Sequence, residues 1–184
     1  MRALAATFGL AAVLAVPAGA AAVDPKALVL RQADVPDGFR VVPDQSGIRS
    51  NRELAKGGPE HRRQVERSGR VTGFFRLWQR RAPGVSVLVG SLADVCRAAR
   101  GATAWLAWLD ARARRQSTRT HLRRRVVRIG DEGWAYSTTR LGGTALVGWR
   151  RGRVVALVST SGLGLGKALD LAGRQQRRIA AALG

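Results

Sequence analysis

The densest group of side chains that could bind a charged partner lies in residues 112–128. This basic segment carries eight arginines and no acidic residue: Arg112, Arg114, Arg115, Arg119, Arg123, Arg124, Arg125 and Arg128. Guanidinium forks pair well with phosphate, so the segment predicts a polyanion site for anionic envelope polymers or lipid headgroups. No aromatic residue interleaves the arginines, so neither base stacking nor sequence-specific nucleic-acid binding is expected. The alternative is a solvated connector between a helix and a strand.

The charge of the whole chain has two possible origins. The 32 basic and 12 acidic residues give a formal net charge of +20. Only three basic residues are lysines, and the bias toward arginine, alanine, glycine and valine is typical of a GC-rich genome. Genome composition and selected polyanion binding therefore both account for the charge.

A glycine-rich segment at residues 161–168 is similar to a phosphate loop but departs from it twice. Ser161 stands where a Walker A loop needs Gly, and Ala168 stands where it needs Ser or Thr. Lys167 also occupies the third glycine position of the dinucleotide pattern. We expect a strand-to-helix turn and no nucleotide cofactor, although amides at a helix start can hold an anion weakly.

The other candidate catalytic residues lack partners at useful spacing. Asp131 and Glu132 are adjacent in a glycine-flanked turn, where carboxylates usually point apart. His61 and His121 lie among arginines, with no cysteine or histidine at metal-ligand spacing. Cys96 has apolar neighbours, which predicts a buried, unreactive thiol. We therefore assign no catalytic residue, metal or other cofactor, and the missing motifs argue against an enzyme.

Residues 1–22 have the features of a secretory signal peptide. Arg2 precedes an uncharged apolar run at residues 4–16, Pro17 interrupts it, and small residues follow. The run is shorter than the ~18–20 residues that span a bilayer. The sequence predicts a secreted, extracytoplasmic protein with no transmembrane segment after cleavage.

The remaining chain predicts one domain. Residues 23–69 are irregular and turn-rich with short helices, and residues 70–184 form an α+β core with which they make a single unit. The order is strand, strand, helix at 97–115, four strands and a terminal amphipathic helix. We expect one antiparallel sheet of about six strands with two main helices packed on one face.

Large aromatic residues fall on neighbouring predicted strands: Trp78, Trp134, Tyr136 and Trp149. A core packed against the helix that carries Trp105 and Trp108 accounts for them. The alternative is an apolar ligand pocket between the sheet and this helix.

Three segments carry a resemblance: residues 30–39 with the pattern Leu-x-x-x-Asp-Val-Pro-x-Gly-Phe, residues 69–74 with Gly-Arg-Val-Thr-Gly-Phe, and residues 130–134 with Gly-Asp-Glu-x-Trp. The chain resembles small exported proteins of high-GC Gram-positive bacteria and, loosely, extracellular sensor-like domains of that group. The resemblance implies an α+β secreted domain and carries over no catalytic residue. Such sensor domains often carry paired cysteines, whereas this chain has Cys96 alone.

Together these features predict an exported, non-enzymatic binding or envelope-associated domain with a basic surface. The alternative is a secreted hydrolase whose site is assembled from residues distant in sequence. A nucleophile, a base and an orienting acid within hydrogen-bond reach would favour the hydrolase.

We predict cleavage after Ala20 or Ala22 during export, because small residues follow the apolar run. N-terminal sequencing of the protein from the culture medium should give a first residue of Ala21 or Val23. A secreted chain that still begins at Met1 would contradict the prediction.

Overall fold

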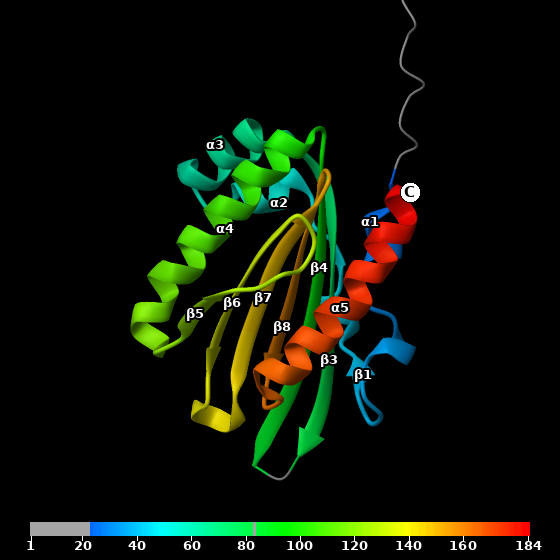
Figure 1. The fold of residues 1–184 in the computed structure, drawn as a ribbon, viewed down its shortest axis with the longest axis vertical. Helices are drawn as coiled ribbons and strands as arrows, with labels where there is room; N and C mark the ends of the chain where they lie inside the picture. Colours follow the sequence, from blue (N-terminus) through cyan, green and yellow to red (C-terminus); the bar gives the residue numbers. More distant parts are fainter. Residues whose placement is uncertain (1–22, 83) are drawn as a thin grey trace, which may run out of the picture.

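One antiparallel sheet lies between two groups of helices in the computed structural model, which describes residues 23–82 and 84–184 (Figure 1). The strand order is β1-β3-β4-β8-β7-β6-β5, and β2 also pairs with β3. The predicted signal peptide lies outside the described residues. Within them, no helix is both long and apolar enough to span a membrane.

The strands are β1 (Arg40–Val41), β2 (Gly47–Ile48), β3 (Arg70–Ala82), β4 (Val85–Cys96), β5 (Arg123–Val126), β6 (Glu132–Thr138), β7 (Thr144–Arg151) and β8 (Val154–Ser161). The α-helices are α1 (Pro25–Leu28), α2 (Asn51–Ala55), α3 (Pro59–Ser68), α4 (Ala99–Thr120) and α5 (Gly164–Leu183). Three short 3-10 helices are η1 (Gln32–Asp34), η2 (Pro43–Gln45) and η3 (Arg140–Gly142).

The predicted hairpin and meander are confirmed, and the structure shows how they join. β3 and β4 form the hairpin, and β5 to β8 form the meander. α4 carries the chain from β4 to the far edge of the sheet, and the meander returns until β8 pairs with β4. One continuous sheet results.

The α+β class with one antiparallel sheet is confirmed, but the sheet has eight strands and helices cover both of its faces. The expectation of helices on one face is wrong because the central strands are apolar on both sides. On β8, Val154, Ala156 and Val158 belong to the core under α5, whereas Val155 and Leu157 belong to the core under α4. A strand that is apolar on both faces needs cover on both.

On the α5 face, a buried polar network fixes the helix to the sheet. Gln175, which is 0% exposed, accepts a hydrogen bond from Ser91 Oγ at 2.8 Å and donates to the Leu92 carbonyl at 2.9 Å. Ser91 Oγ in turn accepts from the Leu30 N–H at 3.1 Å. Three segments distant in sequence therefore meet at one hydroxyl.

On the α4 face, a buried ion pair has the same function. Arg70 Nη2 lies 2.6 Å from Asp94 Oδ1, with the two side chains 0% and 2% exposed. Trp105 of α4 donates to Asp94 Oδ2 at 2.7 Å, and Arg70 donates to Asn51 Oδ1 at 2.7 Å. A side chain at Gly73 would collide with both charged groups, so this position requires glycine.

The prediction that Cys96 is buried is confirmed, since it is 0% exposed at the end of β4. Burial, and to a lesser extent the Asp94 carboxylate, raises the pKa of its thiol to about 12. Because the thiolate is the reactive form, a thiol reagent at pH 8 should label the protein only after denaturant is added. Rapid stoichiometric labelling of the native protein would contradict this expectation.

We predict that Asp94→Asn lowers the free energy of unfolding by about 3–5 kcal/mol, because it leaves the buried Arg70 charge uncompensated. Denaturant unfolding measures the change. Asp37→Asn is the control, since Asp37 is exposed and has no described hydrogen-bond partner; it should cost within about 0.5 kcal/mol. A loss below about 1 kcal/mol for Asp94→Asn would show that the pair is dispensable.

Candidate functional site

The structure divides the predicted basic segment among several environments. Three arginines are held by carboxylates: Arg114 and Arg124 by Asp110, at 3.5 and 2.8 Å, and Arg115 by Glu60 at 3.3 Å. These three side chains are therefore engaged within the protein, and the eight arginines do not form one site.

Asp110 is the centre of the first of these clusters. It accepts hydrogen bonds from Arg124 Nε and Nη2, at 3.1 and 2.8 Å, and from Tyr136 Oη at 2.7 Å. Burial alone would raise the pKa of the Asp110 carboxyl, but these bonds and the positive charges bring it below its ordinary value. Arg124 thus connects β5 to α4.

Three more arginines lie elsewhere. Arg112 contacts His61 Nε2 at 2.7 Å, on the side of α4 that faces the sheet. Arg128 is exposed in the loop between β5 and β6. Arg119 lies near the end of α4, and its side chain is not among the parts of the chain that the structure describes.

Arg123 and Arg125 do share a site. Strand alternation places them on the opposite face of β5 from Arg124. Both are exposed and line a groove of about 990 Å³, here called the basic groove. Its lining is His121, Leu122, Arg123, Arg125, Ser137, Thr138, Thr139, Arg140, Gly142, Gly143, Gly164 and Leu165, with no acidic residue among them.

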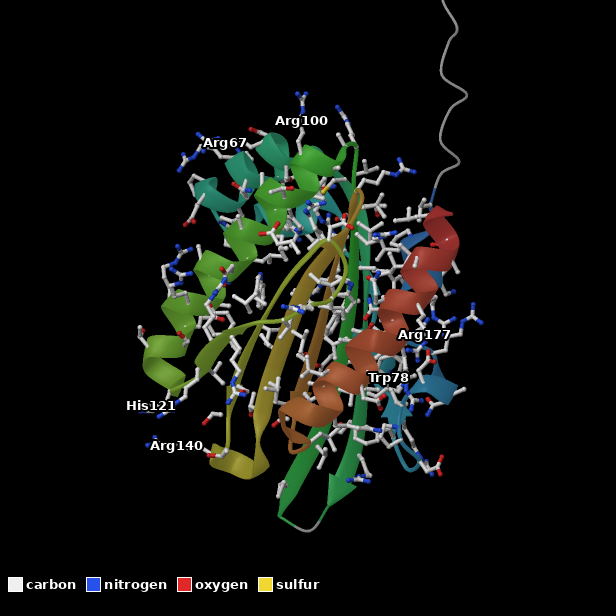
Figure 2. The ribbon with its side chains drawn as sticks, in the orientation of Figure 1. Arg67, Trp78, Arg100, His121, Arg140 and Arg177 are labelled. Atoms are coloured by element: carbon white, nitrogen blue, oxygen red, sulfur yellow. The ribbon has the colours of Figure 1, made fainter. Side chains whose placement is uncertain are left out.

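The opposite wall of the basic groove combines Arg140, which the sequence did not single out, with the start of α5 in the glycine-rich segment 161–168. Arg140 lies in η3, between β6 and β7, and Figure 2 shows it at the same end of the molecule as His121. The first turn of α5 carries no acidic residue and no side-chain cap, so backbone amides there retain hydrogen-bonding capacity. Within the described residues, the side chains of Arg123, Arg125 and Arg140 have no carboxylate partner.

The two parts of this opposite wall, η3 and the start of α5, meet because a glycine allows close approach. Gly143 has φ of 89°, and a Cβ there would lie 2.9 Å from Gly164 Cα. The Gly143 carbonyl accepts a hydrogen bond from the Gly162 N–H at 2.8 Å. The pairing of Thr144 with Ser161 sets this contact. This cross-strand register is the signal that would have added Arg140 to the predicted anion-binding residues.

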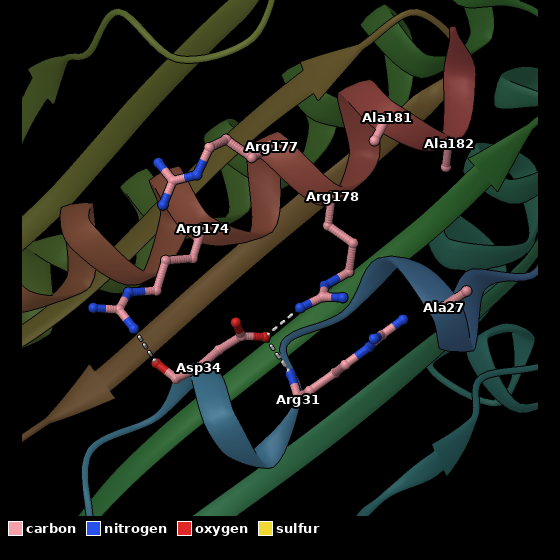
Figure 3. A pocket seen from close by; sticks show the side chains of 8 residues that line it. All are labelled: Ala27, Arg31, Asp34, Arg174, Arg177, Arg178, Ala181 and Ala182. Atoms are coloured by element: carbon pink, nitrogen blue, oxygen red, sulfur yellow. Dashed lines mark hydrogen bonds and ion pairs between the residues drawn. The ribbon is translucent and has the colours of Figure 1, made fainter.

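A second basic groove, of about 640 Å³, lies beside α5, but a carboxylate occupies it (Figure 3). Asp34 accepts from Arg178 Nη2 at 2.6 Å and from the Arg31 N–H at 2.7 Å. Arg174 donates to the Asp34 carbonyl at 3.4 Å. The acid of the N-terminal motif therefore fixes η1 to the C-terminal helix and partly neutralises this groove.

Asp131, a candidate for acid–base chemistry, is used structurally. It accepts from Arg150 and Arg151 at 2.9 and 3.0 Å and from the Gly152 N–H at 2.8 Å. The hydrogen bond from Gly152, followed by those positive charges, lowers the pKa of the Asp131 carboxyl. Glu132 lies 3.5 Å from Arg150 Nε.

One set of residues of the kinds that a hydrolase would use lies in a single pocket of the described structure. Ser159, His61 and Asp94 line one pocket under α4, but no hydrogen bond joins any two of them among the described residues. Both oxygens of Asp94 are engaged, by Arg70 and Trp105. In the part of the chain that the structure describes, no group of three or more His, Cys, Asp or Glu side chains is placed to hold a metal ion.

Comparisons with known proteins concern the fold. No protein family matches the sequence, and no curated protein matches it. The extracellular domain of PknH from Mycobacterium tuberculosis is similar in structure, with a TM-score of 0.56 and 11% sequence identity over 89% of this chain and 100% of that domain. The chain therefore shares its fold with an extracellular domain of a high-GC Gram-positive bacterium.

Proposed function

We propose that the protein is an exported, non-enzymatic domain that binds phosphate-bearing polymers of the cell envelope through the basic groove. The observation that carries the proposal is the groove's charge: Arg123, Arg125 and Arg140 line it, and no acidic residue does. The predicted signal peptide supports an envelope location. A fold shared with an extracellular domain agrees with it.

The groove differs from the other arginine clusters of the structure in its free hydrogen-bonding capacity. In the clusters at Asp110, Asp131 and Asp34 the arginines are paired with carboxylates. A guanidinium already paired with a carboxylate must exchange that partner before it binds phosphate. The guanidinium groups in the basic groove have no carboxylate partner among the described residues. Phosphate can therefore bind there without first displacing a carboxylate.

The lining also suits successive phosphates. Arginine forks bind phosphate oxygens, and the hydroxyls of Ser137, Thr138 and Thr139 can donate to others. The amino end of α5 adds a partial positive charge at Gly164 and Leu165. No Phe, Tyr or Trp side chain lines the groove, so the repeating backbone of the polymer, rather than a base, is the feature recognised.

The test removes the two groove arginines of β5 and measures the salt dependence of binding. A short duplex DNA of arbitrary sequence is the probe, because each phosphate contact there contributes about 0.9 to the log–log salt slope. Arg123→Gln with Arg125→Gln should lower the slope by about 0.9 for each arginine and weaken binding to poly(glycerol phosphate) in parallel. Arg124 stays unchanged because it is paired with Asp110.

The matched control is Arg63→Gln with Arg67→Gln on α3, which removes the same two charges. Both residues are exposed without an acidic partner in the described chain, and Figure 2 shows Arg67 at the end of the molecule away from Arg140. The control should keep nearly the parent slope. Equal losses in both double variants would show that binding follows net charge alone, and the groove would not be the site.

A further inference from the structure

The two faces of the sheet are covered unequally. Under α5, central residues such as Ala93, Val147 and Val158 are 0% exposed. Under α4, Leu92, Leu146 and Leu157 on the neighbouring strands β4, β7 and β8 are only partly buried. The cause is a pocket of about 260 Å³ between α4 and the sheet, here called the α4 pocket.

Two adjacent cross-strand rows form the floor of the α4 pocket. One row is Phe75, Leu92 and Leu157, and the next is Gly90, Ser159 and Leu146. Gly90 and Ser159 have the smallest side chains in these rows. A Cβ at Gly90 would collide with Ser159 Oγ, so the absence of a side chain there lets Ser159 and the Phe75 ring pack against β4.

The roof is one face of α4, where Trp105, Trp108, Leu109 and Arg112 recur at helical spacing. The two indole rings stack with centroids 4.9 Å apart. Together with the leucine floor they form walls that favour an apolar body. The volume lies just under the ~300 Å³ at which ordinary ligand pockets begin, so the ligand is small.

The charged side chains of the α4 pocket that have no carboxylate partner in the described chain are arginines. Arg112 lies 5.7 Å from the centre of the Trp108 ring and 2.7 Å from His61 Nε2. Because a guanidinium only donates, Nε2 is the acceptor in this contact. Arg49 lines the same pocket, and neither arginine has a carboxylate partner in the described chain.

The acidic residue of the lining cannot neutralise them. Asp94 Oδ1 accepts two hydrogen bonds from Arg70, and Oδ2 accepts one from Trp105. That pair is neutral as a unit, so the half-buried Arg112 leaves one positive charge beside apolar walls with no carboxylate partner in the described chain, whereas Arg49 is exposed at the edge of the pocket and near the Glu53 carboxylate. A half-buried cation such as Arg112 is best satisfied by an anionic ligand group.

We infer that the α4 pocket binds a small organic carboxylate with an apolar aromatic or branched aliphatic body. The body lies on the leucine floor beside Trp108, and the carboxylate accepts hydrogen bonds from Arg112, which His61 orients. Arg112 lines the α4 pocket and not the basic groove, whereas Arg123 and Arg125 line the basic groove and not the α4 pocket. The inference is therefore independent of polymer binding.

The experiment compares phenylacetate with its neutral analogue phenylacetamide by calorimetry and tryptophan fluorescence. Phenylacetate should bind saturably with one site per chain, and phenylacetamide at least about tenfold more weakly. Arg112→Gln should weaken phenylacetate binding about 10- to 100-fold, the range for a lost charged hydrogen bond, and leave phenylacetamide binding nearly unchanged. Arg100→Gln is the matched control, because Arg100 is exposed on the same helix outside the pocket and should have no effect.

A second variant tests whether the ligand binds in the α4 pocket, without removing a charge. Ser159→Leu fills the floor and should abolish binding of both compounds, with circular dichroism and thermal unfolding confirming that it folds. No saturable binding of phenylacetate at concentrations on the order of 10 mM would overturn the inference. Equal affinity for the amide would do so too, as would a loss caused by Arg123→Gln with Arg125→Gln instead of Arg112→Gln.

Discussion

The buried ion pair between Arg70 and Asp94 determines how the helices of one face sit on the sheet. Removing two charges from water is unfavourable, and the pair persists because nearly all of its hydrogen-bonding capacity is used. Asp94 accepts from Arg70 and Trp105, and Arg70 also donates to the Arg49 carbonyl at 2.8 Å. Through Asn51 the same guanidinium reaches the start of α2. The hairpin, α2 and α4 are thus joined at one polar centre.

This arrangement also explains why a hollow remains beneath α4. The hydrogen bond from Trp105 to Asp94 fixes α4 to the sheet at one end of the pocket. Farther along the strands, Ser159 and the half-buried leucines of β4, β7 and β8 leave the space beneath the helix unfilled. Under α5 the corresponding anchor is Gln175, which bonds directly to β4, and the surrounding alanines and valines close that face.

The two proposed sites share one electrostatic principle. A chain with 32 basic and 12 acidic residues cannot pair every cation, and each proposed site combines arginines that lack a carboxylate partner with a groove or pocket that can hold an anion. In the basic groove the unpaired arginines are exposed and beside hydroxyls, which suits a hydrated polymer. In the α4 pocket they adjoin indole rings and leucines, which suits a small amphipathic anion.

Local sequence patterns determined most of the elements of this protein. Alternation and turn chemistry predicted the hairpin and the meander, helical spacing predicted α4 and α5, and apolar neighbours predicted the burial of Cys96. These features depend on residues within a few positions of one another, so the amino-acid sequence alone predicts them.

Only the tertiary structure decided which arginines are free. Arg124 is neutralised by Asp110, whereas Arg125, its neighbour, joins Arg140 in the basic groove. The same holds for the α4 pocket, which needs Gly90 and Ser159 to be paired across β4 and β8. Such contacts depend on which strand edges meet and in which register, and that choice reflects the burial of both sheet faces together rather than any local pattern.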